Sequence, residues 1–296
     1  MLTLDEAFAK FKSRQELTER EQEDVSRRHR QVRDIVAGGL RIERDFLSGS
    51  YPRWTKVKPL QDVDVFCVLD EQERAYRRRG PRAILERIEE ILVPVYGKDS
   101  VAIDRMAVTV DFGVAVDEDD ETDEKVMSID VVPAFVKGDH YEIGDAGQGE
   151  WIETDPEIHF QLAVDAHEEY GREWKPLVRM IKKWNGYHGK PVSPSFLLEV
   201  MALELLVPPF SGGYPYELKA FFASAADRIH DTWPDPAGLG PAVSSGMTAE
   251  QKNAAHSALE VAEGMATQAI LLARQGKNGE ALRAWRTLFG PQFPLS

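Results

Sequence analysis

The chain has 296 residues, and its 43% hydrophobic and 29% charged residues are typical of a folded globular protein with a sizeable core. Its formal net charge of -14 argues against a polymerase that grips a long duplex, because such proteins neutralise backbone phosphates with Lys and Arg. The sequence has no run that would span a membrane, no signal-peptide pattern and no second cysteine to pair with Cys67, so we expect a cytoplasmic protein without an intramolecular disulfide.

The first forty residues are predicted to be mostly helical. A short helix is expected around Phe8. A longer helix begins at a capping box formed by Thr18 and Glu21 and ends at Gly38-Gly39.

The segment from Arg41 to about Pro133 is predicted to form a mixed sheet with helices. Expected strands are "LRIERDFLSGS", "DVDVFCVL", "SVAID", "MAVTVDFGVAV" and "KVMSIDVVPAF", and a helix is expected from Pro81 to Tyr96. Between two of these strands lies "DEDDETDE", Asp117 to Glu124. We interpret this run as a solvated connection, because it lacks the Gly and the carboxylate spacing of a calcium loop.

The second half is predicted to be mostly helical. The segment from Val136 to Trp151 is rich in Gly and Asp and is predicted to be a loop that links the halves. Helices are then expected in "DPEIHFQLAVDAHEEY", "EWKPLVRMIKKWNGYH" and "SPSFLLEVMALELL". After a Pro/Gly/Ser connector, Trp233 to Gly246, a final long helix is expected to begin near Thr248, with Gln251 completing a capping box.

Two carboxylates project from one face of a predicted strand. Residues two apart in a strand point to the same side, so Asp62 and Asp64 lie together while Val63 and Val65 face the other way. Unpaired, the two carboxylates would repel each other strongly, and a bound divalent cation would remove that conflict. Magnesium prefers one or two protein carboxylates and completes its shell with water and substrate phosphate. The pattern therefore favours a metal-and-phosphate site.

A third acid would complete a two-metal centre, which can activate an attacking hydroxyl and stabilise a departing pyrophosphate. We predict that this acid is Asp130, because it lies in the apolar strand "VMSIDVVPAF", where a carboxylate without a partner is costly. Asp111, Asp104 and Asp45 are alternatives. Asp111 shares a strand face with Thr109, so an ordinary amphipathic strand accounts for it.

Residues that can bind a phosphate occur both before and after these acids in the sequence. Upstream, Gly49 permits a tight turn and Ser50 adds a hydroxyl beside exposed N–H groups. In the helical half, four basic residues fall at i, i+4, i+7 and i+8 on one face of a predicted helix: Lys175, Arg179, Lys182 and Lys183. This stripe is either a solvated surface or, with the helix start that follows, part of a phosphate site.

That helix start is "SPS". Ser193 is the predicted N-cap, Pro194 the first helical position and Ser195 a residue of the first turn. A helix N-terminus offers free N–H groups and a positive dipole end to a phosphate. Lysine from one helix and serine from the next would then share one triphosphate.

These motifs resemble those of a known family. "GSYPRWTKVKPLQDVDV" followed by "IDVVPAF" is similar to the signature of the polymerase-β-like nucleotidyltransferases. "PLVRMIKKWN" and "SPSFLLEVMALELL" resemble the helical domain shared by the oligoadenylate synthetases, cyclic GMP-AMP synthase and their bacterial cGAS/DncV-like relatives. The resemblance implies an α+β fold, with a polymerase-β-like catalytic core and N-terminal helix in residues 1–150 packed against a helical domain in residues 151–296. The active site would lie in the cleft between them.

The resemblance also implies roles for individual residues. Two Mg²⁺ ions, with Mn²⁺ as the alternative, would be held by three catalytic acids: Asp62, Asp64 and Asp130. The nucleotide triphosphate would be contacted by four residues: Gly49, Ser50, Lys182 and Ser195. The register of the helix leaves Lys183 open as the alternative to Lys182. Trp54 stands where relatives usually carry a small residue.

The implied function is a bacterial nucleotidyltransferase that makes a cyclic di- or trinucleotide second messenger from ATP, with or without other NTPs, in defence against phage. No zinc-binding insertion and no long basic surface is found, so long duplex nucleic acid is not an expected partner. A membrane is not expected either, because no run would span one, and regulation by a partner protein is left open. One alternative is a linear RNA-extending or tRNA-end-adding nucleotidyltransferase, which the net charge disfavours. Another is a catalytically silent nucleotide-binding module, which the presence of all three acids disfavours.

Overall fold

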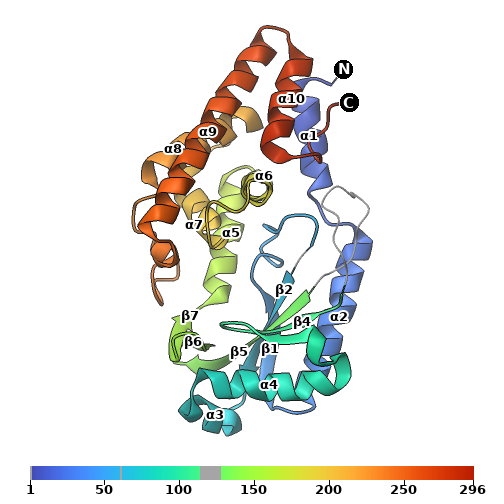
Figure 1. Ribbon diagram of the computed structural model, residues 1–296, viewed down its shortest axis with the longest axis vertical. Coiled ribbons are helices and arrows are strands. Elements are labelled where there is room, and N and C mark those ends of the chain that lie inside the picture. Colours follow the sequence, from blue (N-terminus) through green and yellow to red (C-terminus); the bar gives the residue numbers. More distant parts are fainter. Residues whose placement is uncertain (1, 61, 114–127) are drawn as a thin grey trace.

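A computed structural model of the protein describes residues 2–60, 62–113 and 128–296 (Figure 1). Its helices are α1 (Leu4–Arg14), α2 (Glu19–Ala37), α3 (Arg74–Arg79), α4 (Pro81–Tyr96), α5 (Pro156–Glu169), α6 (Trp174–Tyr187), α7 (Phe196–Leu205), α8 (Tyr214–Arg228), α9 (Ala249–Arg274) and α10 (Asn278–Phe289). Its strands are β1 (Ile42–Ser48), β2 (Asp62–Leu69), β3 (Val101–Ile103), β4 (Val108–Asp111), β5 (Ser128–Lys137), β6 (His140–Asp145) and β7 (Glu150–Thr154). The acidic run Asp117 to Glu124 lies outside the described residues.

The strands form one mixed sheet. In space the order is β1-β2-β5-β4-β3, and β6 and β7 extend the sheet from the far part of β5. β2 and β5 are parallel, whereas the other neighbouring pairs are antiparallel. The predicted α+β fold with a mixed sheet is confirmed.

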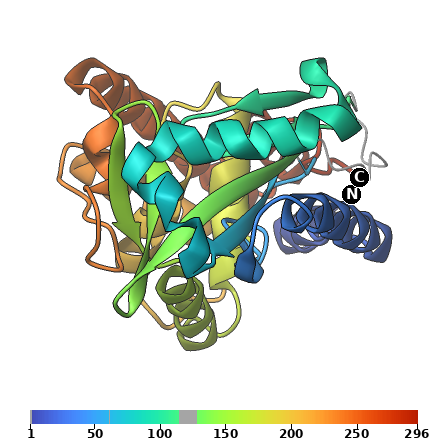
Figure 2. The same cartoon turned by 90° about the horizontal axis from the view of Figure 1, so that it is seen from below.

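The two faces of the sheet have different partners. On β2, Val63, Val65 and Cys67 are buried in a hydrophobic cluster that also contains residues of α2 and α4, which pack on this face (Figure 2). Because side chains alternate along a strand, Asp62 and Asp64 project from the opposite face. The acids are thus on the side of the sheet that α2 and α4 leave uncovered.

Local signals in the sequence account for several elements. Thr18 caps α2 and forms the predicted capping box with Glu21, and Thr248 caps α9 in the same way with Gln251. α4 begins at Pro81, at the first position of the helix, as predicted. The patterns above do not predict α3, α8 or α10.

The segment from Val136 to Trp151 is not a linking loop, and the prediction is wrong here. It contains the end of β5, all of β6 and the start of β7, which form two successive antiparallel pairs. The Gly residues that suggested a loop are turn residues: Gly138, with φ +68°, lies between β5 and β6, and Gly149, with φ +74°, lies between β6 and β7.

A second large hydrophobic cluster fills the helical half, and α6 lies within it. Residues 174–185 of α6 are all buried. The N-terminal α1 also belongs to this cluster, because the ring of Phe8 packs edge-on against Trp285 of α10 with their centroids 5.0 Å apart. Among the described helices, none is both long enough and apolar enough to cross a membrane.

Candidate active site

Acidic side chains gather where β2 and β5 run side by side. The parallel register places Asp64 directly beside Asp130, and Asp62 beside Ser128. On the other side of β5, Thr109 of β4 is the register partner of Asp130 and its hydroxyl donates a hydrogen bond of 2.7 Å to Asp130 Oδ1. The register therefore puts the three predicted acids on one patch of the sheet, with Asp64 and Asp130 adjacent and Asp62 two residues along.

Negative charge is disfavoured on this patch. Burial, followed by the charges of Asp62 and Asp130, raises the pKa of Asp64 to about 7. Burial also raises the pKa of Asp130, although the hydrogen bond from Thr109 opposes that shift. A divalent cation bound between these carboxylates would relieve both effects.

The donor set suits Mg²⁺ or Mn²⁺, because carboxylate oxygens are the ligands that such hard cations prefer. In the described part of the chain, no three His, Cys, Asp or Glu side chains are placed closely enough to hold an ion as they stand. An ion held by all three acids therefore requires a change from this arrangement, in which Asp62 lies two residues along β2 from the adjacent pair.

The alternative acids have other partners, although Asp111 lies on the same face of the sheet, level with Asp62 across Ser128. Asp45 projects from the opposite face of the sheet, where its carboxylate lies 3.5 Å from the guanidinium of Arg33 on α2. Asp104 and Asp111 are exposed, and each accepts a hydrogen bond from a nearby backbone N–H. These contacts account for all three without a ligand.

The Gly-Ser turn packs directly on one of the acids. Gly49 has a φ of +68°, which favours glycine. A Cβ at this position would lie 1.8 Å from Asp64 Oδ2, far inside van der Waals contact. Glycine thus lets the turn after β1 close over the Asp64 carboxylate.

Gly49→Ala is expected to impair activity far more than an equally strained substitution elsewhere. Gly138 provides the matched control, because its φ is also +68° but a Cβ there meets nothing within 4 Å. Both variants carry a backbone cost of about 1–2 kcal/mol, measurable as a loss of thermal stability. Only Gly49→Ala must also displace Asp64, and we expect its turnover to fall at least about tenfold. Equal turnover of the two variants would contradict this role of the turn.

A pocket of about 330 Å³ is lined from both halves of the chain and includes one of the three acids, Asp62, but not Asp64, Asp130 or Gly49. Ser50 and Asp62 line it from the sheet half, and Lys182 and Ser195 line it from the helical half. Lys183 lines it as well, so the choice between the two lysines stays a prediction. Residues about 130 positions apart in the sequence thus share one pocket.

The basic stripe of α6 is not a solvated surface. Its four members are buried because α6 lies inside the helical half: Lys175, Arg179, Lys182 and Lys183. Arg179 donates a hydrogen bond of 2.9 Å to the carbonyl oxygen of Trp54, just beyond the Gly-Ser turn. The helix therefore supports the turn in addition to lining the pocket.

The predicted start of α7 is wrong by two residues. Ser195, not Ser193, is the N-cap, and the helix begins at Phe196. The N–H groups of Leu197 and Leu198 donate to carbonyls three residues back, so the chain enters the helix through a tighter turn. The Ser195 side chain makes no capping hydrogen bond, which leaves its hydroxyl exposed at the pocket.

Sequence reasoning missed Glu199, which joins the two halves behind the pocket. Its buried carboxylate accepts hydrogen bonds from Arg53 Nε at 2.9 Å, Thr55 Oγ1 at 2.8 Å and Lys182 Nζ at 3.0 Å. Burial alone would raise the pKa of Glu199, but the charges of Lys182 and Arg53 outweigh it and lower this pKa to about 2. A lone acid among the apolar residues of "FLLEVMA" was the signal in the sequence.

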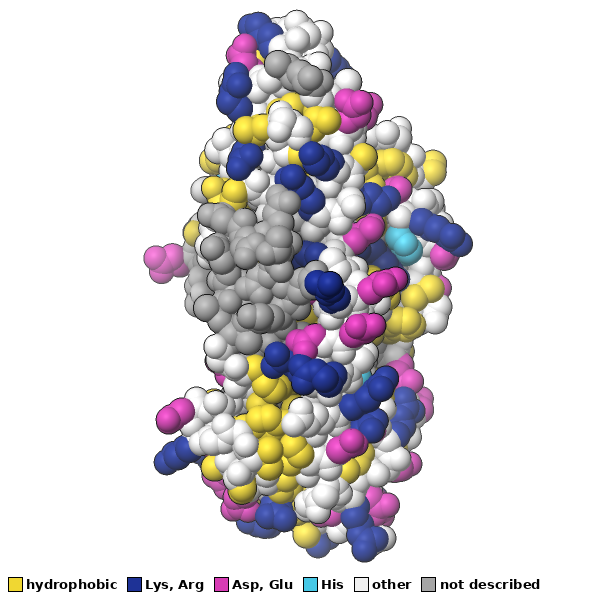
Figure 3. All heavy atoms as spheres, turned by 90° about the vertical axis from the view of Figure 1, so that its right-hand side faces the viewer, with side chains coloured by type: hydrophobic (Ala, Val, Ile, Leu, Met, Phe, Trp, Pro, Cys, Tyr) yellow, Lys and Arg dark blue, Asp and Glu magenta, His cyan; other side chains and the backbone are white. Residues whose placement is uncertain are grey.

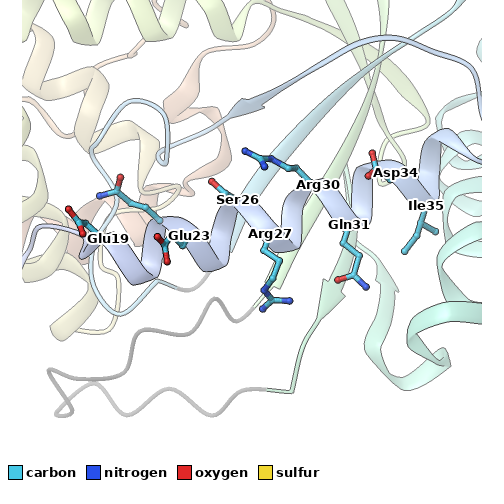
Figure 4. Close-up of a pocket in the computed structure, with 9 residues that line it drawn as sticks. Glu19, Glu23, Ser26, Arg27, Arg30, Gln31, Asp34 and Ile35 are labelled. Atoms are coloured by element: carbon cyan, nitrogen blue, oxygen red, sulfur yellow. The ribbon is translucent and has the colours of Figure 1, made fainter.

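Gly49 lines a separate pocket of about 360 Å³, whereas a hollow along α2 holds none of the predicted site residues. A larger hollow of about 1080 Å³ runs along the outer face of α2, where charged side chains such as Glu19, Arg27 and Asp34 line it (Figure 4). All its described lining residues come from that one helix, so we assign no site there. On the face shown in Figure 3, the coloured Lys and Arg side chains are interspersed with Asp and Glu rather than gathered into one basic field.

The chain is similar to proteins that build nucleotide messengers. The family model described as the Second Messenger Oligonucleotide or Dinucleotide Synthetase domain matches residues 2–166. A Bacillus cereus protein named "Probable cyclic nucleotide synthase" is 26% identical, over 83% of this chain and 81% of its own length. A "Cyclic AMP-AMP-AMP synthase" of an Acinetobacter species is 24% identical, over 92% of this chain and 80% of its own.

Solved structures share the fold. CdnC of Escherichia coli MS115-1, solved with ATP, matches with a TM-score of 0.72 at 18% identity, covering 99% of both chains. The CD-NTase CdnG of Bradyrhizobium diazoefficiens, solved with GTP, matches with a TM-score of 0.74 at 14% identity, covering 98% of this chain and 96% of that one. The family match, residues 2–166, spans more than half of the chain. The chain belongs to the Second Messenger Oligonucleotide or Dinucleotide Synthetase family and is a cGAS/DncV-like nucleotidyltransferase.

Proposed function

We propose that this nucleotidyltransferase makes a cyclic di- or trinucleotide second messenger from ATP, alone or with another NTP. The observation that carries the proposal is the pocket lined by Ser50 and Asp62 from one half and by Lys182 and Ser195 from the other. A triphosphate suits such a pocket, because it needs cations and hydroxyl donors along its length and a metal-binding group at its reacting end.

In the proposed reaction a ribose hydroxyl of one nucleotide attacks the α-phosphate of another. The hydroxyl oxygen forms a bond to the α-phosphorus and its proton passes to solvent. The bond from the α-phosphorus to the oxygen that bridges to the β-phosphate breaks, and pyrophosphate leaves with that oxygen. Asp62, Asp64 and Asp130 would hold two Mg²⁺ ions, or Mn²⁺, which when bound supply positive charge for the attacking and leaving oxygens. Ser50 and Ser195 orient the phosphate chain. A second attack, by a free hydroxyl of the linear intermediate, closes the ring.

The similar proteins support this product and its substrates. Two relatives are named for cyclic nucleotide synthesis, one of them for cyclic AMP-AMP-AMP. CdnC was solved with ATP and CdnG with GTP, which supports NTP substrates here. CdnC was also solved in complex with HORMA-deltaN, at a TM-score of 0.72 to this chain, and we propose that a protein partner regulates this enzyme too.

The proposal extends to the setting of the enzyme. The catalytic cleft would lie between residues 1–150 and 151–296, in a bacterial cytoplasm, with no membrane or long duplex nucleic acid as a partner. The biological role would be defence against phage. Cells that carry the wild-type gene in its native context should survive phage challenge better than cells that carry an Asp64→Asn copy. Equal survival would contradict the defence role but not the proposed reaction.

The biochemical test is direct. Purified protein with Mg²⁺ and the four labelled NTPs is expected to yield products that resist phosphatase, and nuclease digestion followed by mass spectrometry would identify bases, ring size and linkage. Extension of added RNA without a cyclic product would favour the linear enzyme instead. Tight ATP binding without any turnover, across a range of metals and pH values, would favour a silent module.

A further inference from the structure

Lys56 is a buried lysine in the pocket whose side-chain nitrogen has no acceptor among the residues that the structure describes. The residue lines the pocket and is only 6% exposed. Its Nζ makes no hydrogen bond within the described residues, and it lies over the Tyr51 ring, 4.3 Å from the ring centroid. An ammonium has three donors, and burying it without an acceptor is costly.

Two other lysines of the same pocket already have carboxylate partners. Lys58 Nζ lies 2.9 Å from the buried carboxylate of Glu21, and Lys182 Nζ lies 3.0 Å from Glu199. Lys56 receives only the more distant attraction of Glu21 and Asp62, and burial lowers its pKa to about 6. A bound polyanion would supply the missing acceptor and favour the charged form.

We infer that Lys56 binds the phosphates beyond the α-phosphate of the bound nucleotide. The reacting α-phosphate must lie at the acids, so the rest of the triphosphate extends into the pocket that Lys56 lines together with Ser50 and Ser195. A charge-assisted hydrogen bond from a desolvated ammonium to phosphate is among the stronger polar contacts in proteins. Lys56 is thus a positioning residue for the polyphosphate. This inference rests on the proposed function, from which it takes the nucleotide.

The test compares ligands with and without the outer phosphates. Calorimetry with Mg²⁺ present would measure binding of inorganic tripolyphosphate, ATP and AMP to the wild-type protein and to Lys56→Met. We expect tripolyphosphate and ATP to bind about tenfold more weakly to the variant, and AMP to bind within about twofold of wild type. Lys56→Arg should recover part of the loss, because it restores the charge and the donors.

A matched control separates this contact from a general effect of charge. Lys252→Met removes a lysine from α9, outside the pocket, and should leave all three affinities unchanged. Equal weakening of ATP and AMP, together with a lowered melting temperature, would show that Lys56 only supports the fold through Glu21 and Tyr51, and would overturn the inference. If Lys56→Met does not fold, Lys56→Gln gives the same comparison.

The result also separates this inference from the proposed function. Wild-type protein that binds tripolyphosphate through Lys56 but forms no cyclic product would support the inference and contradict the function. Cyclic product from wild type, with unchanged ATP affinity in Lys56→Met, would support the function and contradict the inference.

Discussion

Asp64→Asn is expected to abolish product formation while leaving the protein folded. Asp64 lies beside Asp130 across the β2–β5 pair and beneath Gly49, so its charge is central to any cation bound there. We expect turnover to fall by more than about 1000-fold, at or beyond the upper end of the cost of removing one group that stabilises transition-state charge. Product analysis by mass spectrometry, with labelled ATP and Mg²⁺, measures the loss.

Asp111→Asn is the matched control for this change. Asp111 projects from the same face of the sheet on β4, but it is exposed and, among the described residues, accepts a hydrogen bond from the N–H of Gly113. Its loss should leave turnover near wild type. Comparable loss in both variants would place the chemistry elsewhere on this face.

Although Asp64→Asn is expected to abolish activity, it should make the metal-free protein more stable than the wild type near neutral pH. The pKa of Asp64 in the folded protein is about 7, above its ordinary value of 3.8, so the folded state holds the proton more tightly than the unfolded chain. Metal-free wild type therefore loses stability as the pH rises from about 4 to about 7, and Asn removes that loss. Urea denaturation of both proteins without metal at pH 5 and pH 8 would reveal it, and Mg²⁺ should stabilise only the wild type.

Glu199→Gln is expected to have the largest effect on stability. The substitution leaves Arg53 and Lys182 as buried cations without a counter-charge, and removing one partner of a buried ion pair costs about 3–5 kcal/mol. It also releases Arg53 and Thr55, which connect the Gly-Ser turn to α7. We therefore expect a lower free energy of unfolding together with a higher KM for ATP.

The same helix provides the control for Glu199. Glu204→Gln changes an exposed carboxylate of α7 that pairs with Arg228, and exposed pairs contribute only about 0–1 kcal/mol. The dependence of the free energy of unfolding on pH below about 4.5 gives a second measurement for Glu199. Because the pKa of Glu199 is lowered from 4.5 to about 2, its stabilisation is complete above about pH 4.5 and is lost as the pH falls toward 2. Wild type and Glu199→Gln should converge in stability over that range, and parallel curves would contradict the ion-pair explanation.

Elements with strong local signals were predictable, and weakly marked ones were not. Capping residues, a Pro at a helix start and apolar periodicity depend on a few neighbouring residues, so α2, α4 and the start of α9 agree with expectation. The β6–β7 region was missed because Gly-rich hairpin turns and Gly-rich loops have the same composition. Its pairing is decided by contact with β5, which no local window contains.

By itself, the sequence determined which residue types are available to the site: two acids on one strand face, a third in another apolar strand, a Gly-Ser turn and a basic helix. These follow from the period of a strand and from the cost of an unpartnered carboxylate in an apolar run. Only the tertiary structure decided that Asp64 and Asp130 are neighbours, because strand register is set by packing across the whole sheet. It also decided that the lysines of α6 are buried, that Glu199 accepts a hydrogen bond from Lys182, and that Lys56 has no acceptor among the described residues, because each depends on contacts that no local window contains.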